Sequence, residues 1–137
     1  MFFSPKYYGG IYDLHQEWHT GFLPANSPTI NVDINCELSK MRGTKTIFAF
    51  ATHTHKYGTV VLGYLYRNGQ IKEFARHDPQ GPQMFYPMKK ELAIVNGDYI
   101  AARCTYNTTA ERRMIFFGAF EKFHNNKKIK IYLTALF

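Results

Sequence analysis

Residues 59–76 decide the fold class, and they read TVVLGYLYRNGQIKEFAR. Two runs rich in β-branched and aromatic residues flank Asn68-Gly69. An Asn-Gly pair favours a type I′ turn between antiparallel strands, because both central residues of that turn need a positive φ. The stretch therefore predicts a β-hairpin with its turn at Asn68-Gly69.

Other short strands with turn signals lie on both sides of this hairpin. Residues 29–38 and 44–54 alternate in hydrophobicity, and residues 91–95 and 98–106 flank a second Asn-Gly pair. Residues 78–87 contain three prolines and a glycine, which is typical of a loop. No convincing amphipathic helix appears before residue 110. Many short strands at this spacing predict an all-β fold, an antiparallel β-sandwich of jelly-roll type.

The sequence also makes predictions for the faces of the strand expected at residues 44–54 and for the two ends of the chain. Regular alternation would place Ile47, Ala49 and Ala51 on one face and the two phenylalanines between them on the other. Near the start, one kinked strand or a loop packed on the sheet would account for Tyr12, Leu14, Trp18 and Phe22. Near the end, residues 129–137 alternate in a way that suits a strand, or they did not evolve with the sheet.

Composition sets further bounds. The chain has 137 residues and 45% hydrophobic residues, which suits one folded domain and argues against disorder. No apolar run approaches the roughly 20 residues that span a bilayer, so we expect no transmembrane segment. Residues 1–10 contain no long apolar region of a secretory signal. Either the protein is cytosolic or the sequence lacks its true beginning.

Charge and cysteine content leave alternatives open. The net charge is +7, and residues 111–137 hold six Lys and Arg against two Asp and Glu. This concentration fits a tail that binds nucleic acid or a membrane surface, but a handful of lysines more often marks a solvated end. The two cysteines, Cys36 and Cys104, could bridge one another or could each lack a partner, and their number does not decide.

The motif that suggests chemistry is His53-Thr54-His55. Residues i and i+2 of a strand point to the same face with Cα atoms roughly 6.5–7 Å apart, so two imidazoles could bind one metal ion. The alternative is a pair of surface histidines near a strand end. A metal site needs a third ligand, and a thioether would favour Cu(I). The candidates for that ligand are Met41, Met84, Met88, Met114, His15, His19, His77 and His124.

Several separated motifs resemble one known family. They are the run from Phe48 to Gly58, Arg67-Asn-Gly-Gln70, the Pro-rich segment Asp78 to Pro87, and Gly97 to Cys104. Taken in this order, they resemble the C-terminal copper domain of peptidylglycine α-hydroxylating monooxygenase, of the copper type II ascorbate-dependent monooxygenase family. The resemblance covers residues 10–112, with residues 31–36 included. We therefore expect this domain, truncated, at residues 1–112 and a divergent basic tail at residues 113–137.

The resemblance implies an enzyme, a copper-dependent and ascorbate-driven monooxygenase. It would hydroxylate the C-terminal glycine of peptides, the first step of peptide amidation, with His53 and His55 as copper ligands. The cofactors would be copper, with ascorbate as the reductant. The partners would be O2, a glycine-extended peptide and an N-terminal copper domain that this sequence does not contain, and nucleic acid would not be a partner. A location in the secretory pathway or outside the cell follows, in which the sequon Asn107-Thr108-Thr109 could carry a glycan.

The sequence also departs from the family. The family's third copper ligand is a Met in a Met-Cys strand after the position of Cys104, and no such strand follows here. Met114 comes too early and has no Cys after it, so the ligand role is not carried over to it. Cys36 and Cys104 are disulfide-type cysteines whose family partners lie in the missing stretch, so we expect both unbridged. An arginine that holds the substrate carboxylate is replaced by Ala51. A non-catalytic remnant, or a binding domain with a weak metal site, is therefore the alternative.

Overall fold

The computed structural model of the protein describes residues 11–17, 21–117 and 130–136, and within these ranges it contains strands and no helix. The strands are β1 (Ile11–Glu17), β2 (Gly21–Leu23), β3 (Ile30–Glu37), β4 (Lys45–Thr54), β5 (Gly58–Arg67), β6 (Gln70–His77), β7 (Tyr86–Ile94), β8 (Tyr99–Tyr106), β9 (Ile115–Phe117) and β10 (Lys130–Leu136). None of the described residues forms a helix that could span a membrane.

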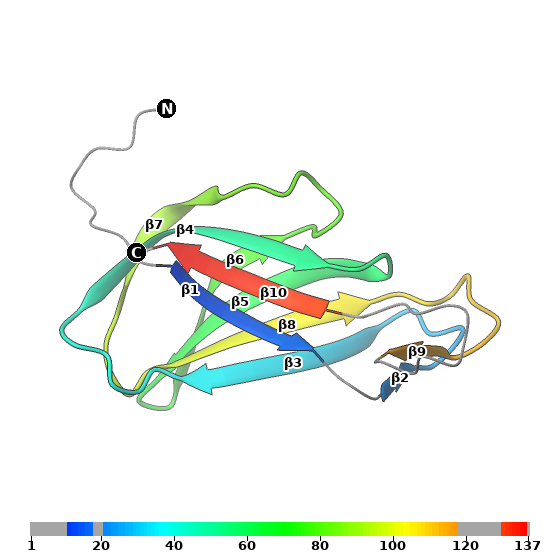
Figure 1. Ribbon diagram of the computed structural model, residues 1–137, viewed down its shortest axis with the longest axis horizontal. Helices are drawn as coiled ribbons and strands as arrows, with labels where there is room; N and C mark the ends of the chain where they lie inside the picture. The colour runs from blue at the N-terminus through cyan, green and yellow to red at the C-terminus, as the bar shows by residue number, and fades with distance from the viewer. Residues whose placement is uncertain (1–10, 18–20, 118–129, 137) are drawn as a thin grey trace.

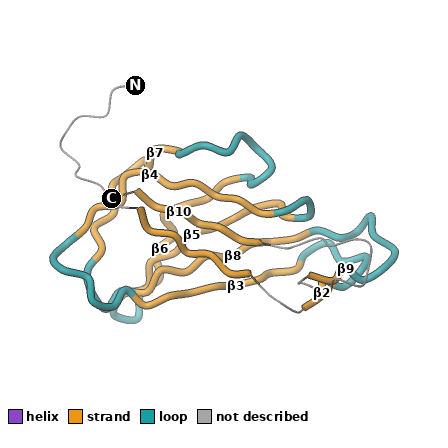
Figure 2. The backbone as a smooth tube through the Cα atoms, in the orientation of Figure 1, coloured by secondary structure: helices purple, strands orange, loops and turns teal. Residues whose placement is uncertain are grey.

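Two four-stranded antiparallel sheets form the molecule (Figure 1). One has the order β1-β10-β4-β7 and the other the order β3-β8-β5-β6. The short pair β2-β9 lies at one end, and loops join the strands at both ends (Figure 2). The expected antiparallel β-sandwich is confirmed, whereas its jelly-roll type stays a prediction.

The hairpin at Asn68-Gly69 is confirmed. Arg67 pairs with Gln70, and the two turn residues have φ angles of 50° and 74°. The second Asn-Gly pair has a different role, because β7 and β8 belong to different sheets. This turn therefore carries the chain from one layer of the sandwich to the other.

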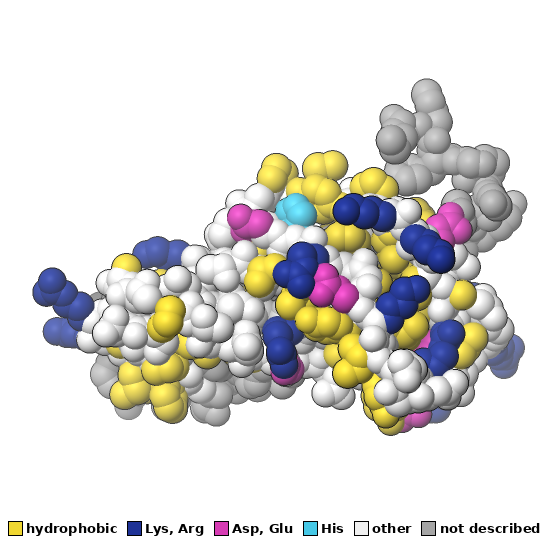
Figure 3. All heavy atoms as spheres, turned by 180° about the vertical axis from the view of Figure 1, so that it is seen from behind, with side chains coloured by type: hydrophobic (Ala, Val, Ile, Leu, Met, Phe, Trp, Pro, Cys, Tyr) yellow, Lys and Arg dark blue, Asp and Glu magenta, His cyan; other side chains and the backbone are white. Residues whose placement is uncertain are grey.

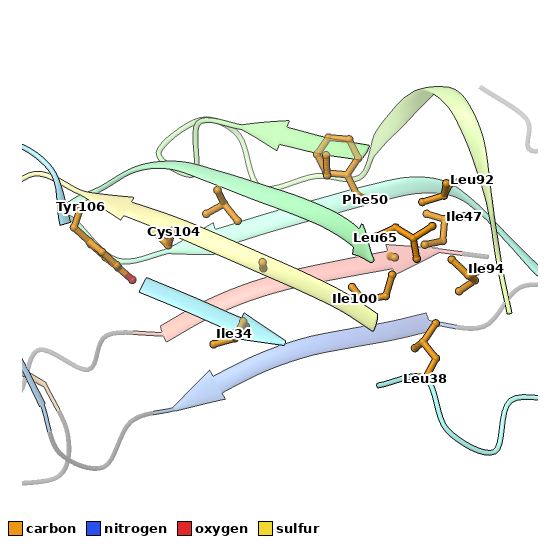
Figure 4. Close-up of a cluster of buried hydrophobic side chains, with 14 of the residues drawn as sticks. Ile34, Leu38, Ile47, Phe50, Leu65, Leu92, Ile94, Ile100, Cys104 and Tyr106 are labelled. Carbon is orange, nitrogen blue, oxygen red and sulfur yellow. The ribbon is translucent and has the colours of Figure 1, made fainter. Parts of the chain in front are cut away.

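A hydrophobic core fills the space between the two sheets (Figure 4). The sheet of β4 contributes Ile47, Phe50, Leu92, Ile94 and Ala135, and the other sheet contributes Ile34, Val61, Leu65, Ala75, Ile100, Ala102, Cys104 and Tyr106. Burying such side chains is worth roughly 25 cal/mol per Å² of apolar surface, so the core fixes how the two sheets pack.

The expected faces of β4 need a correction. Ile47 and Phe50 are both buried, at 0% and 7% exposure, although regular alternation would put them on opposite faces. The cause is a shift of the β4–β7 register between Ile47 and Ala49. In this gap one residue of β4 opposes four residues of β7, and the irregularity changes which positions of β4 face inward. From Phe50 onward, the even-numbered residues of β4 are the buried ones.

The two ends of the chain take part in the sheets. Tyr12 and Leu14 lie in β1 and Phe22 in β2, while Trp18 lies outside the described residues. Residues 130–136, within the region that the sequence assigned to a basic tail, form β10 between β1 and β4. The alternation at the end of the sequence correctly indicated this strand, and the domain boundary at residue 112 stays a prediction.

A buried ion pair fastens the crossing between the sheets. Asp98 is 2% exposed and receives hydrogen bonds from Arg67 Nε at 2.7 Å and Nη2 at 2.6 Å. The backbone N–H of Val95 donates to the same carboxylate at 2.8 Å. The hydrogen bonds from Arg67 hold the pKa of Asp98 below its ordinary value, against the opposing effect of burial. The hairpin strand β5 is thereby tied to the turn before β8.

We predict that Arg67→Met lowers the free energy of unfolding by about 2 kcal/mol, less than for a fully buried pair because the guanidinium is partly exposed. Arg76→Met removes an exposed pair with Glu73 and is the matched control, which should change stability little. In the unsubstituted chain, Asp98 adds to the free energy of unfolding at a pH above the ordinary carboxyl pKa. This added stability is lost as the pH falls through the lowered pKa of Asp98. Urea unfolding across a pH series should show a smaller acid-side loss of stability in the Arg67→Met variant than in the Arg76→Met variant.

Candidate metal centre

His53 and His55 lie at the end of β4 on the side that faces away from the core. Their side chains are half-buried, whereas Thr52 and Thr54 are 6% and 3% exposed. The two imidazole centroids are 5.5 Å apart, with an angle of 64° between the ring planes. The i, i+2 spacing therefore brings the rings together on one face, as the sequence predicted.

The loop between β6 and β7 contacts both histidines. Gln83 Nε2 lies 2.7 Å from His53 Nδ1. Gln80 Nε2 donates to the backbone carbonyls of His55 and Gly58, each at 3.1 Å. One glutamine thus orients an imidazole, and the other holds the backbone where β4 ends.

Contacts of its own fix this loop. The hydroxyl of Tyr86 donates to the carbonyl of Pro82 at 2.6 Å, and its ring lies 3.9 Å from that of His77. The backbone N–H of Gln80 donates to Asp78 Oδ1 at 2.9 Å. The loop therefore presents its two glutamines in a defined position, although it contains no regular secondary structure.

A buried polar cluster lies beneath the histidine pair. Thr54 Oγ1 and the hydroxyl of Tyr106 form a hydrogen bond of 2.9 Å, and Tyr106 is fully buried. Cys104 is also fully buried, and burial raises the pKa of its thiol. Cys104 packs in the hydrophobic core, whereas the two imidazoles lie on the outward side of β4. The cluster instead fixes Thr54, the residue between the two histidines.

The turn after β4 is packed tightly. The backbone N–H of Gly58 donates to the carbonyl of His55 at 2.9 Å. A Cβ atom on Gly58 would lie 1.9 Å from Thr54 Cγ2, so only glycine fits. The hydroxyl of Tyr57 donates to Glu111 at 2.6 Å, which ties the turn to the segment before β9.

The other candidate ligands are spread over several parts of the chain. His77 stacks on Tyr86, and no group of three His, Cys, Asp or Glu side chains suited to a metal occurs in the described parts of the chain. Met41 and Met88 pack against the core, whereas Met84 and Met114 are 53% and 52% exposed. His19 and His124 lie outside the described residues, and His15 lies in β1.

The strand beside the histidines is β10. Its Tyr132 is the register partner of His53, and Thr134 is the partner of Ala51. His15 of β1 is the other register partner of Tyr132. The sequence of β10 contains no Met, so the strand nearest the histidines supplies no thioether.

The two cysteines lie on different strands, and the sequon follows β8. Cys36 in β3 is exposed, Cys104 in β8 is buried, and both are free, which confirms that the two are unbridged. The structure gives no support for a disulfide among the described residues. Asn107 is exposed after β8, and its Oδ1 accepts a hydrogen bond from the hydroxyl of Thr109 at 2.6 Å.

Sequence reasoning found the two histidines but missed the residues that hold them. Gln80 and Gln83 lie in the Pro-rich segment that resembles the family, but the sequence alone gave them no role. Two glutamines in a Pro-rich loop could have served as a signal. Thr54 and Tyr106 carried no signal, because their contact joins positions 52 residues apart in the chain.

Comparison with known proteins identifies the class. Residues 7–122 match the family model of the copper type II ascorbate-dependent monooxygenase C-terminal domain. The chain therefore belongs to this family, whose cofactor is copper and whose reductant is ascorbate.

The similar curated proteins are monooxygenases and hydroxylases. The chain is 39% identical over 84 residues to rat (Rattus norvegicus) peptidylglycine alpha-amidating monooxygenase, which covers 61% of the chain and 8% of that protein. It is 36% identical over 100 residues to the Xenopus laevis peptidyl-glycine alpha-amidating monooxygenase B, covering 73% and 11%. Dopamine beta-hydroxylase of the dog (Canis lupus familiaris) is 38% identical over 65 residues, covering 45% and 10%. The chain thus spans about a tenth of the length of these relatives.

We predict that Gly58→Ala lowers the free energy of unfolding by about 1–3 kcal/mol, because the added methyl group has no space beside Thr54. Thr54→Ser removes the clashing methyl group and keeps the hydroxyl that bonds Tyr106. The double variant should therefore recover most of the stability lost in Gly58→Ala, measured by thermal or urea unfolding. Equal losses of stability in the single and double variants would show that the clash with Thr54 is not the reason why position 58 requires glycine.

Proposed function

We propose that His53 and His55 bind copper and that the chain is a copper-binding domain of a monooxygenase acting on the C-terminal glycine of peptides. The observation that carries the proposal is the pair of adjacent imidazoles, 5.5 Å apart on the outward side of β4. Membership of the copper monooxygenase family supports the metal, and the amidating relatives support the peptide substrate.

The contact with Gln83 fits a metal role for His53. A histidine that binds metal through one ring nitrogen donates a hydrogen bond through the other. Copper at Nε2 requires hydrogen on Nδ1, and Gln83 can accept it because the amide O and N are interchangeable by rotation. The amide would then hold the imidazole in the orientation and tautomer that copper needs.

Copper, when bound, supplies the redox chemistry for O2, with ascorbate as the source of electrons. The residues of this chain have positioning roles in that chemistry. Gln83 orients His53, and Gln80 fixes the backbone at His55. A glycine-extended peptide would approach the outward face of β4, and an N-terminal copper domain, as in the family, would provide the second metal.

Two features favour a weak site over a complete one. The strand next to the histidines, β10, contains no Met, and Ala51 provides no cation for a substrate carboxylate. Two neutral imidazoles leave positions for water or other ligands, and Cu(I) loses the soft donor that favours it. The alternative function is therefore a non-catalytic remnant or a binding domain with a weak metal site.

The metal site is tested by titrating Cu(I) into the chain against a competing chelator. We expect weak binding that His53→Ala or His55→Ala abolishes. Gln83→Ala should lower copper affinity by about 10–100-fold, as for other partners of ligating histidines. Tyr132→Met places a thioether at the register partner of His53 and should raise Cu(I) affinity, because directly opposed positions share a face.

Leu133→Met is the matched control, because its register partner is the buried Thr52. It should leave Cu(I) affinity unchanged. Binding that survives both histidine substitutions would remove the site assignment. Tight binding by the unsubstituted chain that Met84→Leu or Met114→Leu weakens would mean that one of these exposed methionines is the third ligand.

Turnover tests the substrate separately from the metal. The copper-loaded chain, ascorbate, O2 and a glycine-extended peptide are incubated with and without the N-terminal copper domain of an amidating relative. Mass spectrometry should detect the peptide with one added oxygen only when both domains are present, and Ala51→Arg should increase the yield. Copper binding without any hydroxylated product in either variant would favour the non-catalytic alternative.

We also propose that the protein passes through the secretory pathway and carries a glycan on Asn107. Asn107 and Thr109 are exposed, and the hydroxyl of Thr109 already donates to Asn107 Oδ1. Chain expressed through a secretory host should lose apparent mass on treatment with an N-glycosidase, and Asn107→Gln should not. No shift for the unsubstituted chain would refute the glycan.

A further inference from the structure

A groove opens between β6 and β7, which are edge strands of the two different sheets. Its volume is about 420 Å³, within the range of pockets that hold small molecules. The apolar side chains that line it are Phe50, Phe74, Ala75, Pro87, Met88 and Leu92. The groove therefore leads from the molecular surface to the hydrophobic core.

A bulge in β6 forms one wall of this groove. Gly63 of β5 pairs with Ala75 of β6. The next residue of β5, Tyr64, pairs with Glu73, so Phe74 is an extra residue on the edge strand. Bulges bend a strand and redirect side chains, and they are frequent beside binding sites.

A larger irregularity in β7 forms the opposite wall. Ile47 of β4 pairs with Leu92, but Ala49 pairs with Pro87. Residues 88–91 therefore oppose a single residue of β4, and they include three groove-lining residues, Met88 and the two lysines that follow it. The two edge strands are irregular on the same side of the sandwich, which keeps the groove open.

The rim of the groove is basic. Lys72, Lys89 and Lys90 line it, and the structure gives none of them an ion-pair partner among the described residues. Arg76 and Glu73 also line it, and they form an ion pair with each other at 2.8 Å. Figure 3 shows Lys and Arg side chains set among hydrophobic ones on this face. The cations exceed the carboxylates by three, which favours an anionic occupant.

Lysines on edge strands commonly prevent the pairing of one sheet with another. That role needs charge alone and does not require an opening to the core. Bulged, lysine-rich edges also oppose the addition of a peptide strand, so the groove suits a compact ligand better than an extended chain.

We propose that the groove between β6 and β7 binds a small anionic amphiphile, a molecule with an apolar chain and one carboxylate. The chain lies against Phe50, Phe74 and Met88, and the carboxylate lies at Lys89 and Lys90. This site is separate from the histidine pair and from the proposed copper chemistry, because its lining residues include neither histidine and neither of the glutamines that contact them.

The test is calorimetric titration of dodecanoate, below its micellar concentration, into the full chain without added copper. We expect saturable binding at one site. Lys89→Glu with Lys90→Glu should weaken it about tenfold, as two exposed charge contacts predict. Met88→Trp should weaken it by filling the groove. Lys40→Glu with Arg42→Glu changes the net charge equally at exposed positions in the β3–β4 connection and should leave the affinity unchanged.

Dodecyltrimethylammonium, with the same apolar chain and the opposite charge, should not bind measurably. Equal binding of both amphiphiles, or equal weakening by both double variants, would overturn the proposal, since each would show binding without the groove lysines. Absence of dodecanoate binding would also overturn it. Binding of an acidic peptide in place of dodecanoate would assign the groove to a different class of partner and refute the small-amphiphile proposal.

Discussion

The rest of the structure depends on one constraint, which is the choice of β4 side chains that point toward the core. After the bulge near Ile47, the even-numbered residues of this strand face the core, and His53 and His55 face outward. A shift of one residue would bury both imidazoles and expose Phe50, because side chains alternate with a period of two. The core of the sandwich and the histidine pair are therefore set by the same register.

Two segments distant in the sequence, β8 and the loop between β6 and β7, stabilise the end of β4 through three contacts. The hydroxyl of Tyr106 fixes Thr54 from beneath, Gln80 fixes the backbone at His55, and Gln83 contacts the ring of His53. Each contact limits a different degree of freedom: strand position, backbone path and ring orientation. A pair of ligands held in this way loses little entropy on binding a metal, which is the advantage of a site on a sheet.

The sequence predicted most of the fold where local chemistry decides it, as at Asn68-Gly69, whose φ angles determine the turn. It did not predict the partner of each strand, so the second Asn-Gly pair gave no sign that it joins two sheets. The faces of β4 were misassigned because a bulge depends on pairing with β7. The histidine pair was predictable from its i, i+2 spacing, whereas Gln80 and Gln83 act through contacts that only the folded loop creates.

Strand β10 shows that the fold and the proposed site place different demands on the sequence. The family match ends at residue 122, before β10, yet β10 lies between β1 and β4. Sheet pairing uses backbone hydrogen bonds, so any alternating segment of sufficient length can take this position. The proposed metal site would instead depend on particular side chains beside the histidines, and the register position opposite His53 belongs to Tyr132. A chain can therefore complete the sandwich with a strand such as β10, which contains no Met to supply a thioether to the proposed site.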